Sequence, residues 1–526
     1  MAGSWNDLPW DVWVIIFEIL RRTSFKVSKE RFDPSERALQ NHTASAYATV
    51  CRAWQSFFEK RNFRTLVLHQ SDIPLFEHYV HGERRYWVEW VWLRVELPKY
   101  NCRKCHKQES PKEIRRNNTC FTNAIARLFA VLSTWPIYTG YRHRGVALDL
   151  SVHSPSDVEH FCQELKSQSY DSAWIDSPEW PDLISWREVS IYDEKHCWIG
   201  TEPRPWLGRG ELRRVFGRPG GLSLDFRASY AKHLNGTLPK VVCVSLLIIR
   251  RQFYRHYSVS NALKPILHSL QGLHGFRYEP WRGVDTEGRS GLAIRDEEHR
   301  LLLSELGNMP NLGAVSLFEN SAHDYHGRII KEHDPALAEA LAKSSQNLAN
   351  LHISHMIDGK DFLNAAYRDV RLSNELMWHR LKFISLTSPA LSINGHDTLI
   401  QTAAVAARSM PLLDLMEIWH AEQHQACIFR FSRVQDRPCI QLFSTWSGPF
   451  SARAISRWKA ATRDCHYELE QEIYSLTPAS ASSGISILPH LNLVVCVLHL
   501  RSLCQLLSLL EPSEILEQFV EQQRVQ

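Results

Sequence analysis

The sequence predicts an α/β fold in which a small all-helical module precedes a longer body of alternating strands and helices. Two apolar segments of helical character, residues 8–20 and 44–60, open the chain. A short apolar pattern then returns at steps of 39, 36, 33 and 32 residues, with helical stretches between its copies. A chain of 526 residues is long enough for about two to four structural units, so a module and a larger body fit its length.

The first segment predicts a helix with more apolar surface than a small domain can bury. Asn6 and Asp7 can cap it, Pro9 lies in its first turn, and eleven of the thirteen residues from Leu8 to Leu20 are apolar or proline. The helix is too short to cross a membrane, and it is apolar on more than one face. It is therefore expected to contact another protein; the alternative is an ordinary buried helix of a larger core.

The second segment, ASAYATVCRAWQSFFEK, places its large apolar side chains on one helical stripe. The period then changes in NFRTLVLH, which favours a short strand. The stripe consists of Tyr47, Val50, Cys51, Trp54, Phe57 and Phe58.

The order LPWDVWVIIFEIL, then YATVCRAWQSFFEKRNFRTLVL, resembles the F-box pattern of a Leu-Pro helix, a Val-Cys-Arg-x-Trp helix and an exit strand. The resemblance covers residues 6–68 and implies docking onto a Skp1-like adaptor. A polar insert at about residues 21–43 is longer than a usual F-box turn and departs from the pattern. The adaptor-binding residues that the resemblance implies are Leu8, Pro9, Val12, Ile15, Ile16, Ile19, Val50, Cys51 and Trp54.

In the body, the recurring pattern is an apolar residue, two spacers, an apolar residue, one spacer and an apolar residue. Its second and third apolar positions alternate as in a strand and face one side of a sheet. Weaker copies occur at Trp186, Val189 and Ile191, at Val241, Val244 and Leu246, and in GVALDL ending at Leu150. The strong copies are Leu273, Phe276 and Tyr278; Leu312, Val315 and Leu317; Leu348, Leu351 and Ile353; Leu381, Ile384 and Leu386; and Leu413, Met416 and Ile418.

A strand and helix that cannot bury their apolar faces alone must stack on neighbouring copies, so the repeats predict a solenoid. The spacing is longer than in standard leucine-rich repeats and the usual Asn position is mostly missing. The body is therefore predicted as an irregular, leucine-rich-repeat-like strand/helix solenoid. The alternative is a compact α/β domain whose buried strands share this spacing by coincidence.

After the repeats, CIFRF and CIQLF predict a β-hairpin around residues 436–438, followed by a helix from about Ala452 to Tyr474. Small residues then predict a linker. The apolar stretch from Leu491 to Leu510 contains polar residues that are costly in a bilayer, so it is expected to form a buried or partner-facing helix. The predicted units are an F-box module (1–68), a connecting region (69–145), a client-binding body (146–475), a linker (476–488) and a helical tail (489–526).

The chain also resembles a group of uncharacterised fungal F-box proteins in which the module precedes a C-terminal domain of unknown function. The likeness covers about residues 5–470, and the tail after residue 488 falls outside it. It implies an architecture but no substrate. The segments that carry it are WLRVELPKYNCRKC, LDLSVHSPSDVEH, FRYEPWR, VSLFEN, FISLTS and MPLLDLMEIWH.

The motif CRKCH matches half of a zinc site. A structural zinc needs four ligands, and the only additions near Cys102 and Cys105 are His106 and Cys120. These four residues are a weak metal candidate, and the expectation is a reduced thiol pair with no metal or cofactor.

Large aromatic residues beside the repeat strands are candidate anchors for a client. Trp281 and Arg282 follow Tyr278, and Trp419 follows Ile418. Such residues bind partners well when they lie at an exposed rim. The alternative is that both tryptophans pack between repeats.

Composition and motifs exclude several classes of function. The net charge of +4 is too small for a nucleic-acid footprint, and no secretory signal or membrane span is evident, so a cytoplasmic and/or nuclear location is expected. No common catalytic motif occurs, so an enzyme is not expected. The expected function is the substrate-recognition subunit of a Skp1-cullin-F-box ubiquitin ligase, which contacts the adaptor, a cullin through it, and an unknown protein client. The alternative is a scaffold that binds the adaptor without promoting ubiquitination.

Overall fold

The computed structural model describes most of the body and parts of the N-terminal module. The described residues are 12–13, 15–17, 47–137, 145–160, 198–199, 202–203, 209–215, 221–227, 230–251, 255–282, 289–319, 334–370, 377–422, 425–446, 448–481, 484–500, 502–503 and 506. Among the predicted residues, Leu8, Pro9, Ile19 and the weak repeat copy at residues 186–191 lie outside them.

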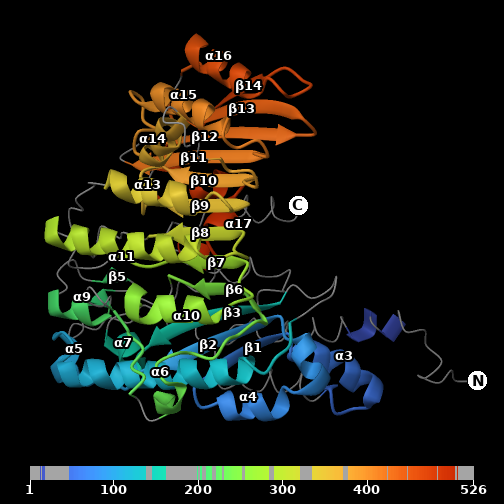
Figure 1. The fold of residues 1–526 in the computed structure, drawn as a ribbon, viewed down its shortest axis with the longest axis vertical. Coiled ribbons are helices and arrows are strands. Elements are labelled where there is room, and N and C mark those ends of the chain that lie inside the picture. Colours follow the sequence, from blue (N-terminus) through green and yellow to red (C-terminus); the bar gives the residue numbers. More distant parts are fainter. Residues whose placement is uncertain are drawn as a thin grey trace, which may run out of the picture.

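Twelve strands form one sheet, and their order across the sheet follows their order in the chain (Figure 1). Neighbouring strands are parallel except for β11 with β12 and β12 with β13, which are antiparallel. Strands β4 (Trp198–Ile199) and β5 (Glu202–Pro203) pair separately. The strands of the large sheet are β1 Thr65–His69, β2 Trp90–Glu96, β3 Val146–His153, β6 Val244–Ile249, β7 Gly275–Tyr278, β8 Ala314–Phe318, β9 Asn350–Ser354, β10 Phe383–Thr387, β11 Leu415–Glu422, β12 Gln425–Val434, β13 Arg437–Ser444 and β14 Glu470–Ser475.

Helices that connect the parallel strands form a layer on one face of this sheet (Figure 1). In the second half of the chain each helix of the layer contacts the next, from α10 through α11, α13, α14 and α15 to α16. The helices of the described residues are α3 Arg52–Asn62, α4 Ile73–Tyr79, α5 Cys102–Cys105, α6 Pro111–Leu132, α7 Pro155–His160, α9 Arg209–Val215, α10 Lys264–Ser269, α11 Arg289–Gly307, α13 Pro335–Ser344, α14 Gly359–Val370, α15 His396–Ala407, α16 Ala452–Ala461 and α17 Val494–Val497. None of them is long and apolar enough to span a bilayer.

The recurring apolar pattern corresponds to strands β7 to β11. The second apolar position of each copy is aligned with that of its neighbours, so that Val315 pairs with Phe276 on one side and Leu351 on the other. All fifteen residues of the strong copies are buried in the core between sheet and helices. The weaker copy at Val241 and Val244 leads into β6, and GVALDL forms part of β3. The structure is thus a mixed α/β protein built on one mostly parallel sheet.

The predicted hairpin is formed by β12 and β13. Gln435 and Asp436 connect the strands with φ of 49° and 64°, the left-handed backbone that tight hairpin turns require. The helix that follows is shorter than predicted. It ends at Ala461, and residues 470–475, predicted as helical, form the edge strand β14, where the chain gains parallel pairing with β13.

Described residues between 484 and 506 lie on the face of the sheet that the helix layer leaves free. Ser316 stands between Val315 and Leu317, which face the helices, so alternation turns its side chain to the opposite face. There its hydroxyl donates to the carbonyl of Val497 at 3.0 Å. Helix α17 lies against β8 and β9 (Figure 1).

We call residues 484–506, as far as they are described, the C-terminal strap. The prediction of a linker and a separate helical tail needs correction here. The strap contains a short 3-10 turn, Leu488–His490, the four-residue α17 and further helical residues at Leu500, Ser502, Leu503 and Leu506. Its apolar side chains form a second core with side chains of the sheet that include Phe318, Trp419 and Ile428. The strap is part of the body because burial of these side chains on the sheet stabilises it there.

Candidate protein-interaction surfaces

The described parts of the N-terminal module pack around one aromatic side chain. Phe17 is fully buried, and its ring centroid lies 5.0 Å from that of Trp54, 4.8 Å from Phe57 and 5.4 Å from Phe58. Such edge and tilted contacts stabilise beyond the area they bury. They hold the helical residues 12–17 against α3.

Other apolar residues of the module face outward. Ile15 is 58% exposed and Val50 is 59% exposed, and Cys51 is exposed beside it. Val12, Ile16 and Trp54 are partly buried. The described residues among those that the F-box resemblance implies therefore include two apolar side chains that are more than half exposed. Exposed apolar side chains are available to a protein partner.

The module is joined to the first edge of the sheet. Helix α3 contacts β1 and the 3-10 turn Gly82–Trp87. Arg84 of this turn forms an ion pair with Glu59 of α3 at 2.9 Å, and its guanidinium lies 5.0 Å from the centre of the Phe63 ring. These contacts place the exposed apolar residues at the end of the molecule where the sheet begins.

The four weak zinc candidates have other partners. Cys105 donates to the carbonyl of Cys102 at 3.0 Å, His106 pairs with Glu211, and Cys120 donates to the carbonyl of Glu96 at 3.4 Å. Burial raises the pKa of both the Cys105 and the Cys120 thiols, which opposes the thiolate form that zinc requires. These contacts fit protonated thiols better than thiolates bound to a metal.

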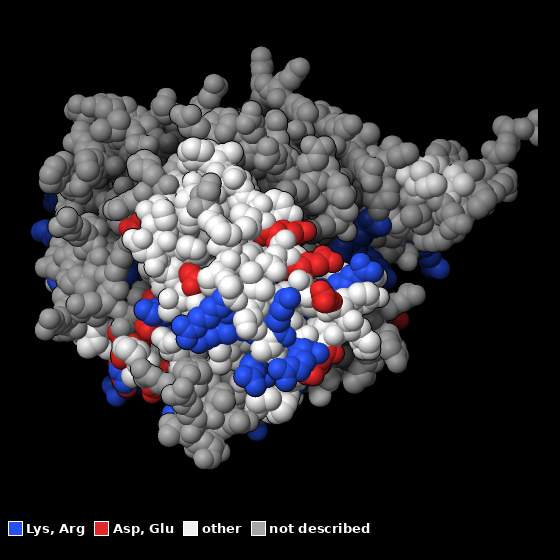
Figure 2. Space-filling model, turned by 90° about the horizontal axis from the view of Figure 1, so that it is seen from above, with Lys and Arg blue, Asp and Glu red and all other residues white. Residues whose placement is uncertain are grey.

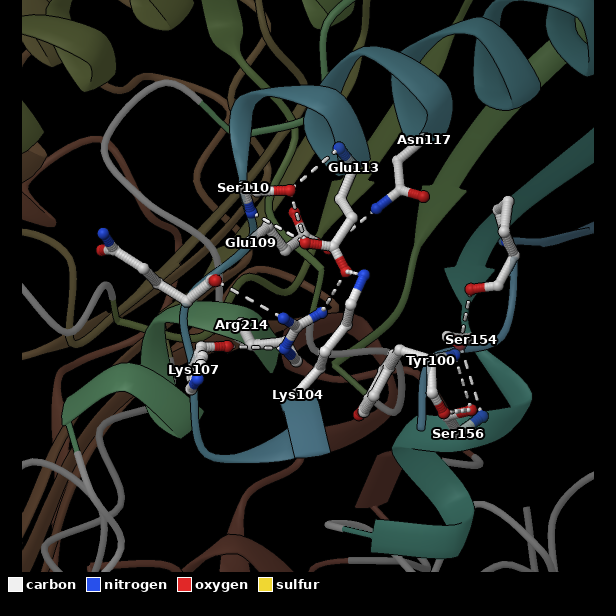
Figure 3. A network of polar contacts seen from close by, with 12 residues as sticks. Tyr100, Lys104, Lys107, Glu109, Ser110, Glu113, Asn117, Ser154, Ser156 and Arg214 are labelled. Carbon is white, nitrogen blue, oxygen red and sulfur yellow. Dashed lines mark hydrogen bonds and ion pairs between the residues drawn. The ribbon is translucent and has the colours of Figure 1, made fainter. Parts of the chain in front are cut away.

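A polar network fixes the turn that carries this Cys pair (Figure 3). Ser110 and Glu113 form a capping box at the start of α6. Glu113 also pairs with Lys104 at 3.2 Å and with Arg214 of α9 at 3.5 Å. Although burial opposes ionisation, the Ser110 hydrogen bonds and the two cations lower the pKa of Glu113 to about 2. The network joins α5, α6 and α9 and is best explained as structural.

Another group of possible metal ligands was missed by the sequence reasoning. Within the described residues, Cys439, Glu470 and Glu472 bring ligand atoms within 4.8 Å of one another on β13 and β14. Burial and the two carboxylates raise the pKa of Cys439 to about 11, and Glu472 already accepts hydrogen bonds from Gln441 and Tyr474. A protonated thiol beside a Glu472 carboxylate that already accepts two hydrogen bonds does not favour metal binding.

In the part of the chain that the structure describes, the sheet ends at β14, and no strand pairs with its outer edge. Figure 2 views this end from above and shows basic and acidic side chains intermixed with uncharged residues on the described surface. Ile473 and Tyr474 of β14 are both exposed, beside Glu470 and Glu472. Charged side chains on an edge strand discourage unwanted pairing with other strands.

The candidate client anchors are buried rather than exposed. Trp281 donates to the carbonyl of Arg251 at 2.5 Å, and Trp419 donates to Ser385 at 3.3 Å. Trp281, Arg282 and Trp419 all have less than a tenth of their surface accessible. The candidate role as exposed client anchors is corrected accordingly, and the stated alternative holds, since both indole rings pack within the body.

A continuous row of polar side chains crosses the helix-free face instead. These residues pair in register from strand to strand, beginning on β7 and ending on β14. Each residue from β7 to β13 is the spacer between two apolar positions of its strand, so it faces away from the helix layer, and Glu472 of β14 joins the row through its pairing with Gln441. We call this set the polar row: Arg277, Ser316, His352, Ser385, Glu417, Arg430, Gln441 and Glu472.

The polar row contacts the strap through main-chain atoms. Glu417 accepts from the N–H groups of Asn492 and Leu493, both at 2.9 Å. Arg430 donates to the carbonyl of His490 at 2.8 Å, and Arg277 donates to the carbonyl of Val495 at 2.8 Å. Each side chain satisfies backbone groups that the irregular strap cannot pair internally.

A further carboxylate serves the end of the strap. Glu279, just after β7, accepts from the N–H of His499 at 2.6 Å and from the hydroxyl of Ser502 at 2.5 Å. Charged side chains of the sheet, together with Glu279, therefore form hydrogen bonds with the strap from His490 to Ser502. A repeat-by-repeat search for polar spacers would have found this row, because the spacer is polar in every strong copy.

A comparison with known protein families finds a match in the C-terminal half of the chain. Residues 308–499 match a family model described as a family of unknown function, DUF6546. The match runs from the end of α11 through the repeats and hairpin into the strap. No curated protein matches the chain. The matched segment thus includes strands β8 to β14 and most of the strap within one family model.

Proposed function

We propose that this protein is the substrate-recognition subunit of a Skp1-cullin-F-box ubiquitin ligase. Its N-terminal helices would dock on a Skp1-like adaptor, and its body would hold a client protein near a ubiquitin-loaded conjugating enzyme. Catalysis of this kind depends on proximity rather than on a reactive side chain of the subunit.

The observation that carries the proposal is the outward position of Ile15 and Val50. Both belong to the F-box-like pattern, and both are more than half exposed although the neighbouring Phe17 is fully buried. Burying apolar surface is worth about 25 cal/mol per Å², so an adaptor that covers both side chains gains affinity from them.

The body supports the leucine-rich-repeat-like interpretation. Strands β6 to β11 follow one another in chain order, and the helices between them lie on one face. A compact doubly wound domain would place helices on both faces and reverse its strand order. A stack of repeats offers an extended frame for a partner protein.

The test is co-purification of the tagged protein with a Skp1-like adaptor and a cullin. Ile15→Glu is expected to abolish adaptor binding, because a carboxylate in an apolar interface must be desolvated. Ile393→Glu is the matched control, since Ile393 is 49% exposed but lies far along the chain in the body. Leu8→Ala combined with Pro9→Ala provides an independent change within the same motif. Adaptor binding that survives these changes would contradict the proposal.

The second candidate is a scaffold that binds the adaptor without promoting ubiquitination. The same exposed residues favour it, because they support adaptor binding only. Recovery of the adaptor without cullin, or no ubiquitin transfer to any co-purified protein, would favour the scaffold.

A further inference from the structure

The helix-free face has features of a peptide-binding site that is already filled. Its charged side chains contact the main chain of the strap rather than its side chains: Glu417 binds two N–H groups, and Arg277 and Arg430 bind carbonyls. Main-chain recognition of this kind does not depend on the sequence of the bound segment, as in other modes of peptide recognition.

The face combines polar and apolar subsites. Beside the polar row, Phe318, Trp419 and Ile428 receive the leucine and valine side chains of the strap. A face built only as protein core would be expected to be apolar, because buried charges cost several kcal/mol each unless paired. Here Glu417 and Arg430 pair with each other at 2.7 Å, so the charges stay compensated whichever segment covers them.

Among its described residues, the internal main-chain hydrogen bonds of the strap are all local. They lie around the 3-10 turn Leu488–His490, in α17 and between His499 and Leu503. A second 3-10 turn, Pro478–Ala481, connects β14 to the strap, and its Ala481 packs in the same core. The position of the strap therefore depends on its contacts with the sheet.

One side chain of the polar row has an unsatisfied polar atom. His352 lies between Ser316 and Ser385 and is buried, and within the described residues its Nδ1 atom has no hydrogen-bond partner. A segment with a donor or acceptor at this point would satisfy the row more completely than the strap does.

We propose that the helix-free face is a polypeptide-binding site and that the C-terminal strap occupies it in cis as a displaceable competitor. The ligand class is an apolar chain segment with short turns, which offers free N–H groups to Glu417 and free carbonyls to Arg277 and Arg430. The proposal rests on the proposed function in one respect: it takes the segment that displaces the strap to be part of the client protein.

The experiment uses the full-length chain with a specific protease site inserted between Ala481 and Gly484 in place of residues 482–483, so that the packed turn Pro478–Ala481 is kept. After cleavage, a fluorescent synthetic peptide of residues 484–506 is added and its incorporation is measured by anisotropy. The labelled peptide is expected to exchange into the cleaved protein and not into the uncleaved protein. Failure to exchange, with the cleaved protein either intact or unfolded, would overturn the proposal.

Variants of the polar row make the test specific. Glu417→Gln is expected to weaken peptide binding about tenfold or more, because it removes a charge-assisted acceptor for two N–H groups. Glu472→Gln is the matched control, since Glu472 lies in the same row but bonds to Gln441 and Tyr474. Equal effects of the two changes would count against the proposal.

Two milder changes keep the test decisive if Glu417→Gln does not fold. Ser316→Ala removes one hydrogen bond to the carbonyl of Val497 and should weaken binding about fivefold. A peptide N-methylated at Leu493 loses the N–H that Glu417 accepts and should bind more weakly than one N-methylated at Val495. No adaptor is present in these assays, so their failure is distinct from failure of the adaptor co-purification.

Discussion

Glu417 and Arg430 form a buried ion pair across neighbouring antiparallel strands, with 2.7 Å between Oε1 and Nε. Each also holds the main chain of the strap, Glu417 at Asn492 and Leu493 and Arg430 at His490. This pair therefore connects the sheet to the strap through three main-chain hydrogen bonds, beside the apolar contacts of the second core.

Removing one partner of this pair should be strongly destabilising. Arg430→Met is expected to lower the free energy of unfolding by about 3–5 kcal/mol, because Glu417 is left buried without its cation. The measurement is chemical denaturation followed by circular dichroism. Arg433→Met is the control, since Arg433 pairs with Asp414 at 3.6 Å on the surface. The double change Glu417→Leu with Arg430→Met should recover part of the loss; no recovery would contradict the importance of charge pairing.

Replacing Phe17 by Ala should loosen the N-terminal module and leave the body intact. Phe17 is central to the module but belongs to neither core of the body. Large-to-small changes at buried phenylalanines cost about 3–5 kcal/mol, more than a small module can lose. Hydrogen exchange in α3 should accelerate while exchange in β7 to β11 stays unchanged. Leu75→Ala, at an exposed position on α4, should change neither region.

The stability of the body should fall in acid through its buried histidines. Burial, reinforced by Arg277, lowers the pKa of His352 to about 3. Its pKa in the unfolded chain is about 6.5, so between these values the unfolded state binds more protons and stability rises with pH.

The free energy of unfolding, measured from pH 6.5 down to pH 4, should show this loss of stability. His352→Asn is expected to reduce the slope by up to one proton, about 1.4 kcal/mol per pH unit. His274→Asn is the control, because His274 is exposed and directly precedes β7. An unchanged slope in His352→Asn would show that this histidine is not buried in neutral form.

Purified protein should contain no stoichiometric zinc, and a chelator should leave its thermal unfolding unchanged. His106 is engaged by Glu211, and Cys120 donates to the carbonyl of Glu96, so neither completes a site with Cys102 and Cys105. Elemental analysis checks the metal content. One equivalent of zinc, lost together with a fall in melting temperature, would contradict this reading.

Much of the sheet could be predicted from the chain because the apolar period of a buried strand is a local property. Val315 and Leu317 sit two residues apart, and the same spacing in the next copies predicted β9 to β11. The end of α16 could not be predicted, because residues 470–475 form a strand only through pairing with β13. Trp419 could not be placed either, since its burial depends on a strap that follows it by about seventy residues in the sequence.

The sequence by itself determined the alternation of strands and helices, the hairpin between β12 and β13, and the apolar N-terminal helices, because each depends on side-chain period or turn chemistry over a few residues. Only the tertiary structure decided which face of the sheet the connecting helices leave free, and that the strap with α17 covers it. Arg277, Glu417 and Arg430 are isolated polar spacers along the chain, and they become one row because parallel strands stack in register. Contacts between residues far apart in the sequence leave no local period, so the strap and its charged partners appear only in the folded molecule.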